Sequence, residues 1–119
     1  MTYDPNNIFA RILRGEIPCK PLLDDDHVLA FADIAPQAPQ HILIIPKGPY
    51  KDHFDFVTRA SADELVAFER AVAKLAHQHN LDTSGYRLIS NCGPDAHQEV
   101  PHHHVHLLGG RPLGPMLSE

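Results

Sequence analysis

The chain has 119 residues, 43% of them hydrophobic, and a formal net charge of −5. These values predict one globular domain, or one subunit of a small oligomer, and argue against a disordered chain. The acidic charge disfavours a general nucleic-acid binder, although backbone amides can still hold a single phosphate. The sequence has no run near the ~18 apolar residues of a membrane span and no signal-peptide pattern. We therefore expect a cytoplasmic protein that binds neither nucleic acid nor membranes.

The N-terminal half predicts a short helix, a hairpin and a strand. Asn6 and Asn7 can cap a helix whose apolar residues repeat at helical spacing and which ends at Gly15. The apolar runs 22–23 and 28–32 flank an acidic turn, which is typical of a hairpin. A proline-rich connection follows over residues 33–40. The continuous apolar run at 41–46 then predicts a central strand.

The C-terminal half predicts a long helix and two further strands. Ser61 and Glu64 form a capping box before a helix over residues 62–79, with an apolar stripe formed by Leu65, Phe68, Val72, Leu75 and Leu81. Strands are expected over 86–90 and 100–108, separated by a loop that starts at residue 91. The order of elements favours an α+β fold, a five-stranded, mainly antiparallel sheet with two helices.

Four of the ten histidines lie between positions 102 and 106, inside the chain and followed by an apolar run, unlike a purification tag. Because side chains alternate along a strand, His102, His104 and His106 share one face, whereas His103 faces the other way. Each buried imidazole needs hydrogen-bond partners for two nitrogens, so a core built from such a row would cost free energy for every nitrogen left unpaired. A chance cluster of surface histidines is one alternative.

A zinc site is a second alternative. Two nitrogens on one zinc ion lie at most roughly 4 Å apart, whereas alternate strand residues are about 6.8 Å apart. Neighbouring histidines can converge on a metal, with His41 as a possible further ligand, but all three would require strong bending of the strand. The two cysteines, Cys19 and Cys92, are isolated and lack CxxC spacing, which disfavours a cysteine-rich metal site. We expect no metal and no cofactor.

Covalent catalysis is the third interpretation of the histidine row. A neutral imidazole can attack phosphorus without first losing a proton. Its neighbours can stabilise phosphoryl oxygens or protonate a departing group. Three imidazoles on one face offer these roles at adjacent positions.

The stretch from Gln98 to Leu108 resembles the signature of the histidine-triad (HIT) family, three alternating histidines followed by two apolar residues. The similarity continues upstream in Asn91, in residues 33–47 and in the opening segments 8–12 and 15–18. The tail over residues 109–116 resembles bacterial members of the Hint branch. Together these segments bracket nearly the whole chain. The resemblance implies a HIT-like fold and a homodimer that joins two sheets.

The resemblance also implies a chemistry, because Hint proteins are purine nucleoside phosphoramidases that cleave the P–N bond of AMP or GMP conjugates. The role of the nucleophile, which forms a nucleotidyl-imidazole intermediate, falls on His104. The main-chain carbonyl of His102 would orient that ring, and His106 would contact the phosphate. His41 would be the fourth histidine of the catalytic site.

The resemblance implies substrate contacts as well. Asp33 matches the acid that binds the ribose hydroxyls, although from its type alone it is equally a turn residue before the proline loop. Asn91 and Gln98 match contacts near the phosphate and the leaving group, and Glu99 stands where some relatives have serine. The apolar positions of the nucleoside site are Ile8, Phe9, Phe31 and Ile34, with Ile12 and Ile17 beside them, and most of them are equally good core residues.

Two positions depart from the family pattern. His97 stands where relatives usually carry glycine, which permits a positive φ, and His103 stands where an apolar residue is common. If the face that carries His103 is buried, its ring needs a hydrogen-bond partner.

Two other functions stay open: a nucleotide-binding regulatory dimer with incidental catalysis, and hydrolysis of dinucleoside polyphosphates, which the tail disfavours.

Overall fold

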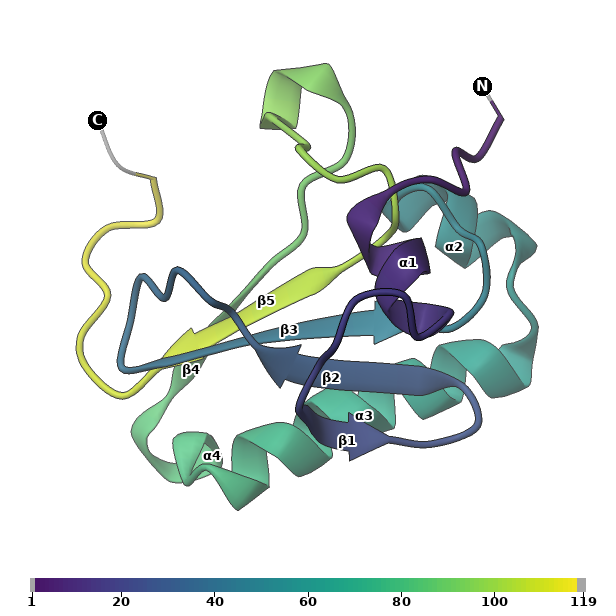
Figure 1. The fold of residues 1–119 in the computed structure, drawn as a ribbon. Helices are drawn as coiled ribbons and strands as arrows, with labels where there is room; N and C mark the ends of the chain where they lie inside the picture. Colours follow the sequence, from purple (N-terminus) through teal and green to yellow (C-terminus); the bar gives the residue numbers. More distant parts are fainter. Residues whose placement is uncertain (1, 118–119) are drawn as a thin grey trace.

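The structure is a computed structural model that describes residues 2–117. One sheet forms its centre, with the strand order β1-β2-β3-β5-β4 and antiparallel pairing between all neighbours (Figure 1). The strands are β1 (Pro21–Asp24), β2 (Val28–Ala32), β3 (Gln40–Pro46), β4 (Tyr86–Ile89) and β5 (Val105–Gly109). The predicted α+β fold with a five-stranded antiparallel sheet is confirmed.

The described residues form four α-helices and a 3₁₀ turn: α1 (Ile8–Leu13), α2 (His53–Arg59), α3 (Ala62–Gln78), α4 (Leu81–Ser84) and η1 (Pro94–Ala96). They include the two predicted helices, α1 and α3. The side chain of Asp52 accepts a hydrogen bond from the Asp55 amide and caps α2. Asn80 takes a left-handed conformation (φ 61°) between α3 and α4, so Leu81 enters the core from its own short helix.

The two faces of the sheet carry different layers. On one face Ile42 and Ile44 of β3 contribute to the main core together with Phe68 and Leu75 of α3. On the other face Leu43 and Ile45 belong to a smaller cluster with Phe9 of α1, Leu29 and Phe31. Figure 1 shows the long helix α3 and the short helix α1 against the sheet. Alternation along β3 therefore separates a thick core from a thinly covered face.

The last strand is shorter than predicted, because it begins at Val105 and not at Val100. Pro101 has no amide proton for a ladder, and the His102 amide turns back to the carbonyl of Val100. The amide of His103 donates to Tyr50, beyond the end of β3. The residues from His102 to His104 thus approach β5 without joining its ladder.

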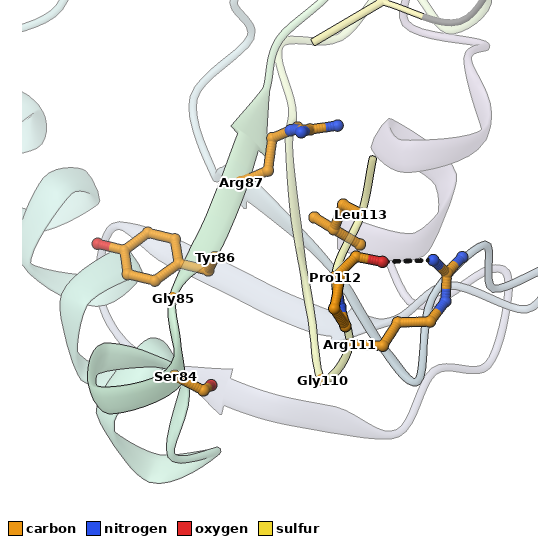
Figure 2. A pocket seen from close by; sticks show the side chains of 8 residues that line it. All are labelled: Ser84, Gly85, Tyr86, Arg87, Gly110, Arg111, Pro112 and Leu113. Carbon is orange, nitrogen blue, oxygen red and sulfur yellow. Dashed lines mark hydrogen bonds between the residues drawn. The ribbon is translucent and has the colours of Figure 1, made fainter. Parts of the chain in front are cut away.

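After β5 the chain turns at Gly110 and runs back beside β4. A pocket lies between the tail and the start of β4, lined by Ser84, Gly85, Tyr86, Arg87, Gly110, Arg111, Pro112 and Leu113 (Figure 2). The Arg87 guanidinium donates hydrogen bonds to the carbonyls of Gly114 and Pro115 and so holds the tail. Within residues 2–117 we find no helix with the length and apolarity needed to cross a membrane.

Candidate active site

His104 is held in a single tautomer on the face of the sheet that α1 covers. Its Nδ1 lies 2.7 Å from the main-chain carbonyl of His102, which can only accept, so Nδ1 carries the proton. The lone pair therefore resides on Nε2. Burial lowers the pKa of His104, whose side chain is 7% exposed and meets Phe9 edge to face at 5.0 Å. The ring is neutral at pH 7 and carries a free nucleophilic nitrogen.

His102 is itself held rigidly and so keeps its carbonyl in place for His104. Its buried ring donates from Nε2 to the carbonyl of Pro46 (2.8 Å) and accepts at Nδ1 from the hydroxyl of Tyr3 (2.6 Å). Burial lowers the pKa of His102 to about 4. Both ring nitrogens are thus occupied by protein groups, so the contribution of His102 to the site is its carbonyl and its rigidity.

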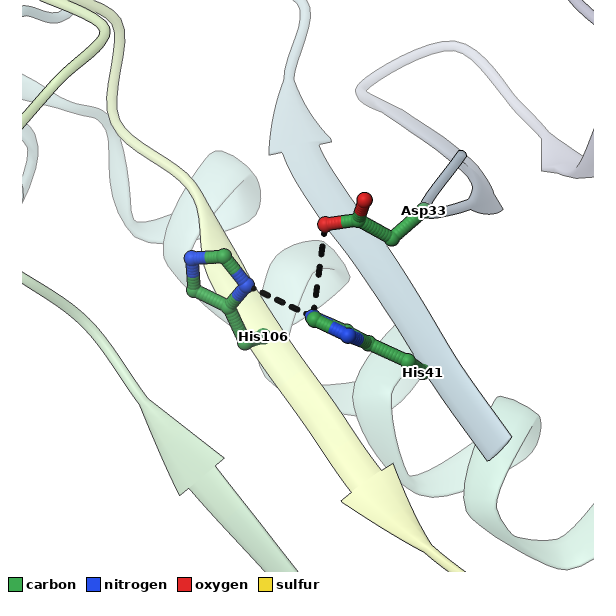
Figure 3. A group of neighbouring side chains, drawn as sticks. All are labelled: Asp33, His41 and His106. Atoms are coloured by element: carbon green, nitrogen blue, oxygen red, sulfur yellow. Dashed lines mark hydrogen bonds and ion pairs between the residues drawn. The ribbon is translucent and has the colours of Figure 1, made fainter. Parts of the chain in front are cut away.

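His41, His106 and Asp33 form a hydrogen-bonded group beside His104 (Figure 3). The Nε2 of His41 lies 2.9 Å from Nδ1 of His106 and 3.4 Å from Oδ2 of Asp33. The His106 ring centroid lies 5.1 Å from that of His104. Burial, followed by the neighbouring histidines, lowers the pKa of His106 to about 4. The His106 imidazole therefore acts as a neutral hydrogen-bond donor and acceptor and not as a fixed cation.

Two adjoining pockets cover this face. The polar one is lined by Phe9, Asp33, Gln37, Leu43, Asn91, His97, Glu99, Val100, His104 and His106. The apolar one is lined by Ile8, Phe9, Ile12, Ile17, Pro18, Cys19, Lys20, Phe31, Ala32, Asp33, Ile34 and Leu43. Asp33 lines both pockets, together with Phe9 and Leu43. The lining suits a ligand with an apolar group on one side of Asp33 and a polar group on the other.

The structure brings most of the predicted site residues to these walls, with three exceptions: His41, Gln98 and His102, which lies under His104. His41 lies behind the polar pocket, where it reaches the site through His106. Gln98 braces the loop: its Oε1 accepts from the Gly93 amide, and its Nε2 donates to the carbonyls of Lys51 and Val100. Sequence reasoning missed Gln37, because its part in the site includes a main-chain amide that no residue type signals.

His97 takes the conformation for which glycine is the usual residue. Its φ of 59° and ψ of 44° lie in the left-handed region, at the end of η1. Nε2 of the exposed imidazole lies 3.1 Å from Oε1 of Glu99. His97 therefore keeps the turn that the glycine position implied and adds a polar group to the rim of the polar pocket.

No lysine or arginine lies among the residues that line the polar pocket, whose charged side chains include Asp33 and Glu99. A phosphate bound there must be held by imidazole N–H groups and amides rather than by a cation. Such donors are effective where burial lowers the local dielectric. The polar pocket thus offers imidazole and amide groups rather than lysine or arginine cations.

His103 faces the opposite side and belongs to the main core. Its ring is 2% exposed, stacks on Phe56 at 5.0 Å and lies 5.3 Å from Phe68. Burial, followed by the charge of His53, lowers the pKa of His103 to about 3. No buried side-chain nitrogen or oxygen among the described residues lacks a hydrogen-bond partner. The departure at this position is therefore accommodated as a neutral core ring.

We expect His103 to make the fold sensitive to acid. Below the unfolded-state pKa near 6.5 the unfolded chain binds a proton at His103, whereas the folded chain does not until about pH 3. The free energy of unfolding should fall by about 1.4 kcal/mol per pH unit for this residue between about pH 6 and pH 4. Urea denaturation at several pH values gives the free energy of unfolding at each pH. Between about pH 6 and pH 4 this free energy should fall less steeply with decreasing pH in His103→Leu than in the wild type. Equal slopes would contradict this origin of the acid sensitivity.

The chain matches the family model described as HIT domain over residues 14–113. It is 58% identical over 118 residues to an uncharacterized HIT-like protein of Azospirillum brasilense, covering 99% of this chain and 97% of that protein. It is 49% identical over 114 residues to the purine nucleoside phosphoramidase of Escherichia coli K12, covering 93% and 92%. The crystal structure of a HIT family hydrolase from Legionella pneumophila superimposes with a TM-score of 0.85 at 42% identity, covering 92% and 96%. The chain therefore belongs to the HIT domain family.

Proposed function

We propose that this protein hydrolyses purine nucleoside 5′-phosphoramidates, such as AMP joined to an amine, through a covalent nucleotidyl group on His104. The observation that carries the proposal is the hydrogen bond from His104 Nδ1 to the His102 carbonyl, which leaves the Nε2 lone pair free. The ring lines a polar pocket that shares Asp33 with an apolar one. The similarity to the phosphoramidase of Escherichia coli supports the same reaction.

In the first step the Nε2 lone pair of His104 attacks phosphorus, and the P–N bond to the amine breaks. The departing nitrogen keeps the bonding electrons and takes up a proton, while the phosphoryl oxygens accept hydrogen bonds from neighbours such as His106. In the second step water attacks phosphorus and loses a proton to solvent, while the bond from phosphorus to Nε2 breaks and its electron pair returns to that nitrogen. AMP is released and the neutral imidazole is restored. One P–N bond is exchanged for another before hydrolysis, so the first step has no large uphill change in bonding.

The base and ribose occupy the apolar pocket in this proposal. Phe9 and Phe31 lie edge to face, with ring centroids 5.9 Å apart, and Ile8 adds a half-exposed apolar surface. Ile34 is fully exposed before a ligand binds, so burying it against a purine would gain free energy. Oδ1 of Asp33 accepts from the Ala35 amide, which leaves Oδ2 to share between His41 and the ribose hydroxyls.

The proposed function is tested by offering AMP-amine, GMP-amine and diadenosine polyphosphate substrates side by side. We expect the phosphoramidates to be cleaved with the larger kcat/KM, at turnover rates within the ordinary range of about 1–1000 per second. Faster cleavage of the diadenosine substrate would indicate that the protein is a dinucleoside polyphosphate hydrolase instead. Tight AMP binding without turnover of any substrate would point to a regulatory nucleotide-binding protein.

We further propose a homodimer in which the β4 edges of two copies meet. Among the described strands β4 pairs only with β5, and three of its apolar side chains are exposed: Tyr86 (43%), Leu88 (44%) and Ile89 (36%). An apolar edge strand with free amides and carbonyls is a template for pairing with another strand.

Sedimentation equilibrium should give twice the chain mass for the wild type. Leu88→Lys should shift the equilibrium towards monomer, because each copy would place a charge on the apolar edge that the proposed joint buries. Val66→Lys, a substitution at an exposed position of α3, should remain dimeric. A monomeric wild type at micromolar concentration would contradict the proposed dimer.

A further inference from the structure

The main chain of Gln37 connects the C-terminal tail to the histidine group of the site. The residue lies in the proline-rich loop between β2 and β3, and its amide donates to Nδ1 of His41 at 3.0 Å. Its carbonyl accepts a hydrogen bond from the Arg111 guanidinium at 3.1 Å. The amide of Gln37 is thus fixed by His41 of the site, and its carbonyl is fixed by Arg111 of the tail.

The amide of Gln37 determines which nitrogen of His41 carries the proton. Because an N–H group points at Nδ1, that nitrogen must present its lone pair, and the proton of the neutral ring lies on Nε2. His41 Nε2 then donates to Nδ1 of His106, 2.9 Å away. Since His106 accepts at Nδ1, its own proton lies on Nε2. The tautomer set at Gln37 is therefore passed on to a ring that lines the polar pocket.

Arg111 reaches Gln37 because the turn after β5 lies close against the proline-rich loop. Gly110 has a φ of +95°, and a Cβ atom at this position would lie 2.9 Å from Cβ of Pro39. The Arg111 guanidinium also donates to the carbonyl of Pro112 at 2.8 Å, which fixes its orientation (Figure 2). The tail thus holds the loop, and the loop holds the imidazole.

We propose that the main chain of Gln37, held by Arg111, is a positioning element that keeps the proton of His41 on Nε2 and hence that of His106 on Nε2. Gln37 and Arg111 would act through the imidazole of His41, without contact with the reacting atoms. The consequence for catalysis rests on the proposed function, because it matters only if His106 must offer an N–H group to a phosphoryl oxygen. The tautomer assignment itself stands on the hydrogen bonds alone.

The same contact explains how a group that could hold a metal is kept for hydrogen bonding. One ligand atom from each of Asp33, His41 and His106 lies within 4.8 Å of the others, which is close enough to share a cation (Figure 3). Binding a cation through His41 Nε2 would need the lone pair there and the proton on Nδ1. That proton would face the N–H of Gln37, so the hydrogen bond would be lost. Removing the amide proton should therefore favour metal binding.

The test is Gln37→Pro, which removes the amide proton, with Gln37→Ala as the matched control that keeps it. Nitrogen-15 NMR of the imidazole rings should show His41 and His106 protonated on Nε2 in the wild type and in Gln37→Ala. In Gln37→Pro the His41 ring should populate both tautomers. We expect kcat of Gln37→Pro to be about tenfold below that of Gln37→Ala, with KM little changed, which corresponds to the loss of one hydrogen bond. Inhibition by Zn²⁺ should set in at lower concentrations than in Gln37→Ala.

Arg111→Ala provides a second variant that leaves the loop sequence intact. It should reduce kcat by a few-fold and shift the His41 nitrogen signals in the same direction, and Arg111→Lys should restore part of both. Unchanged ring nitrogens in Gln37→Pro, checked to be folded by its thermal unfolding, would overturn the proposal. If the wild type cleaves no phosphoramidate the proposed function fails, whereas the tautomer assignment is still judged by the NMR signals.

Discussion

Replacing His104 with alanine should reduce the release of AMP from an AMP-amine conjugate by at least about 10³-fold, because it removes the nucleophile itself. The loss should be in kcat, since the base and ribose contacts in the apolar pocket remain. The variant should stay folded, because the ring of His104 lines a pocket, whereas His102 and His103 are more deeply buried. A coupled assay of AMP formation, with KM measured separately, checks this expectation.

The matched control for His104 is its neighbour His103, whose ring belongs to the main core on the other face of the sheet. His103→Leu keeps an apolar side chain among Phe56 and Phe68, and we expect its activity to stay within about twofold of the wild type. A His104→Ala variant with activity within tenfold of the wild type would reject covalent catalysis at this residue. An equal loss in both variants would indicate that the segment has been disturbed as a whole.

Phe68→Ala should destabilise the protein by about 3–5 kcal/mol, because it leaves a cavity where the core meets the segment that carries the histidines. The Phe68 ring is 1% exposed and lies 5.2 Å from Phe56 and 5.3 Å from His103. Losing it removes apolar contacts of α3 with α2 and with His103. Urea denaturation at pH 7.5, where His103 is neutral in the folded state and largely neutral in the unfolded state, measures the change in unfolding free energy.

Val66→Ala provides the control for this prediction, since Val66 lies on the same helix and is 49% exposed. We expect it to change the unfolding free energy by less than about 0.5 kcal/mol. A loss below about 1 kcal/mol in Phe68→Ala would mean that the core collapses around the missing ring.

The sequence predicted the faces of the histidine row although it placed the strand wrongly. His104 and His106 point to one side and His103 to the other, as the alternation of side chains predicts, although of these three only His106 lies in β5. The ladder itself stops at Val105, because Pro101 and the turn at His102 take the preceding amides out of register. Periodicity is a local property, whereas the length of a strand depends on its partner.

The parts of the site that could not be predicted are main-chain and long-range contacts. Tyr3 donates to His102 from 99 positions away, and no local pattern connects the two. Gln37 acts on His41 through its amide, a group that every residue other than proline carries. The left-handed turn at His97, in contrast, could be anticipated, because the related position usually carries glycine.

The central claim is that the nucleotide is transferred to Nε2 of His104 before water enters. The most direct measurement is mass spectrometry of the protein after acid-free quenching within the first turnover of an AMP-amine substrate, followed by peptide mapping. We expect one nucleotidyl group per active chain on the peptide that contains His104, and no such group in His104→Ala. Full turnover without any adduct, or an adduct located on another histidine, would contradict it.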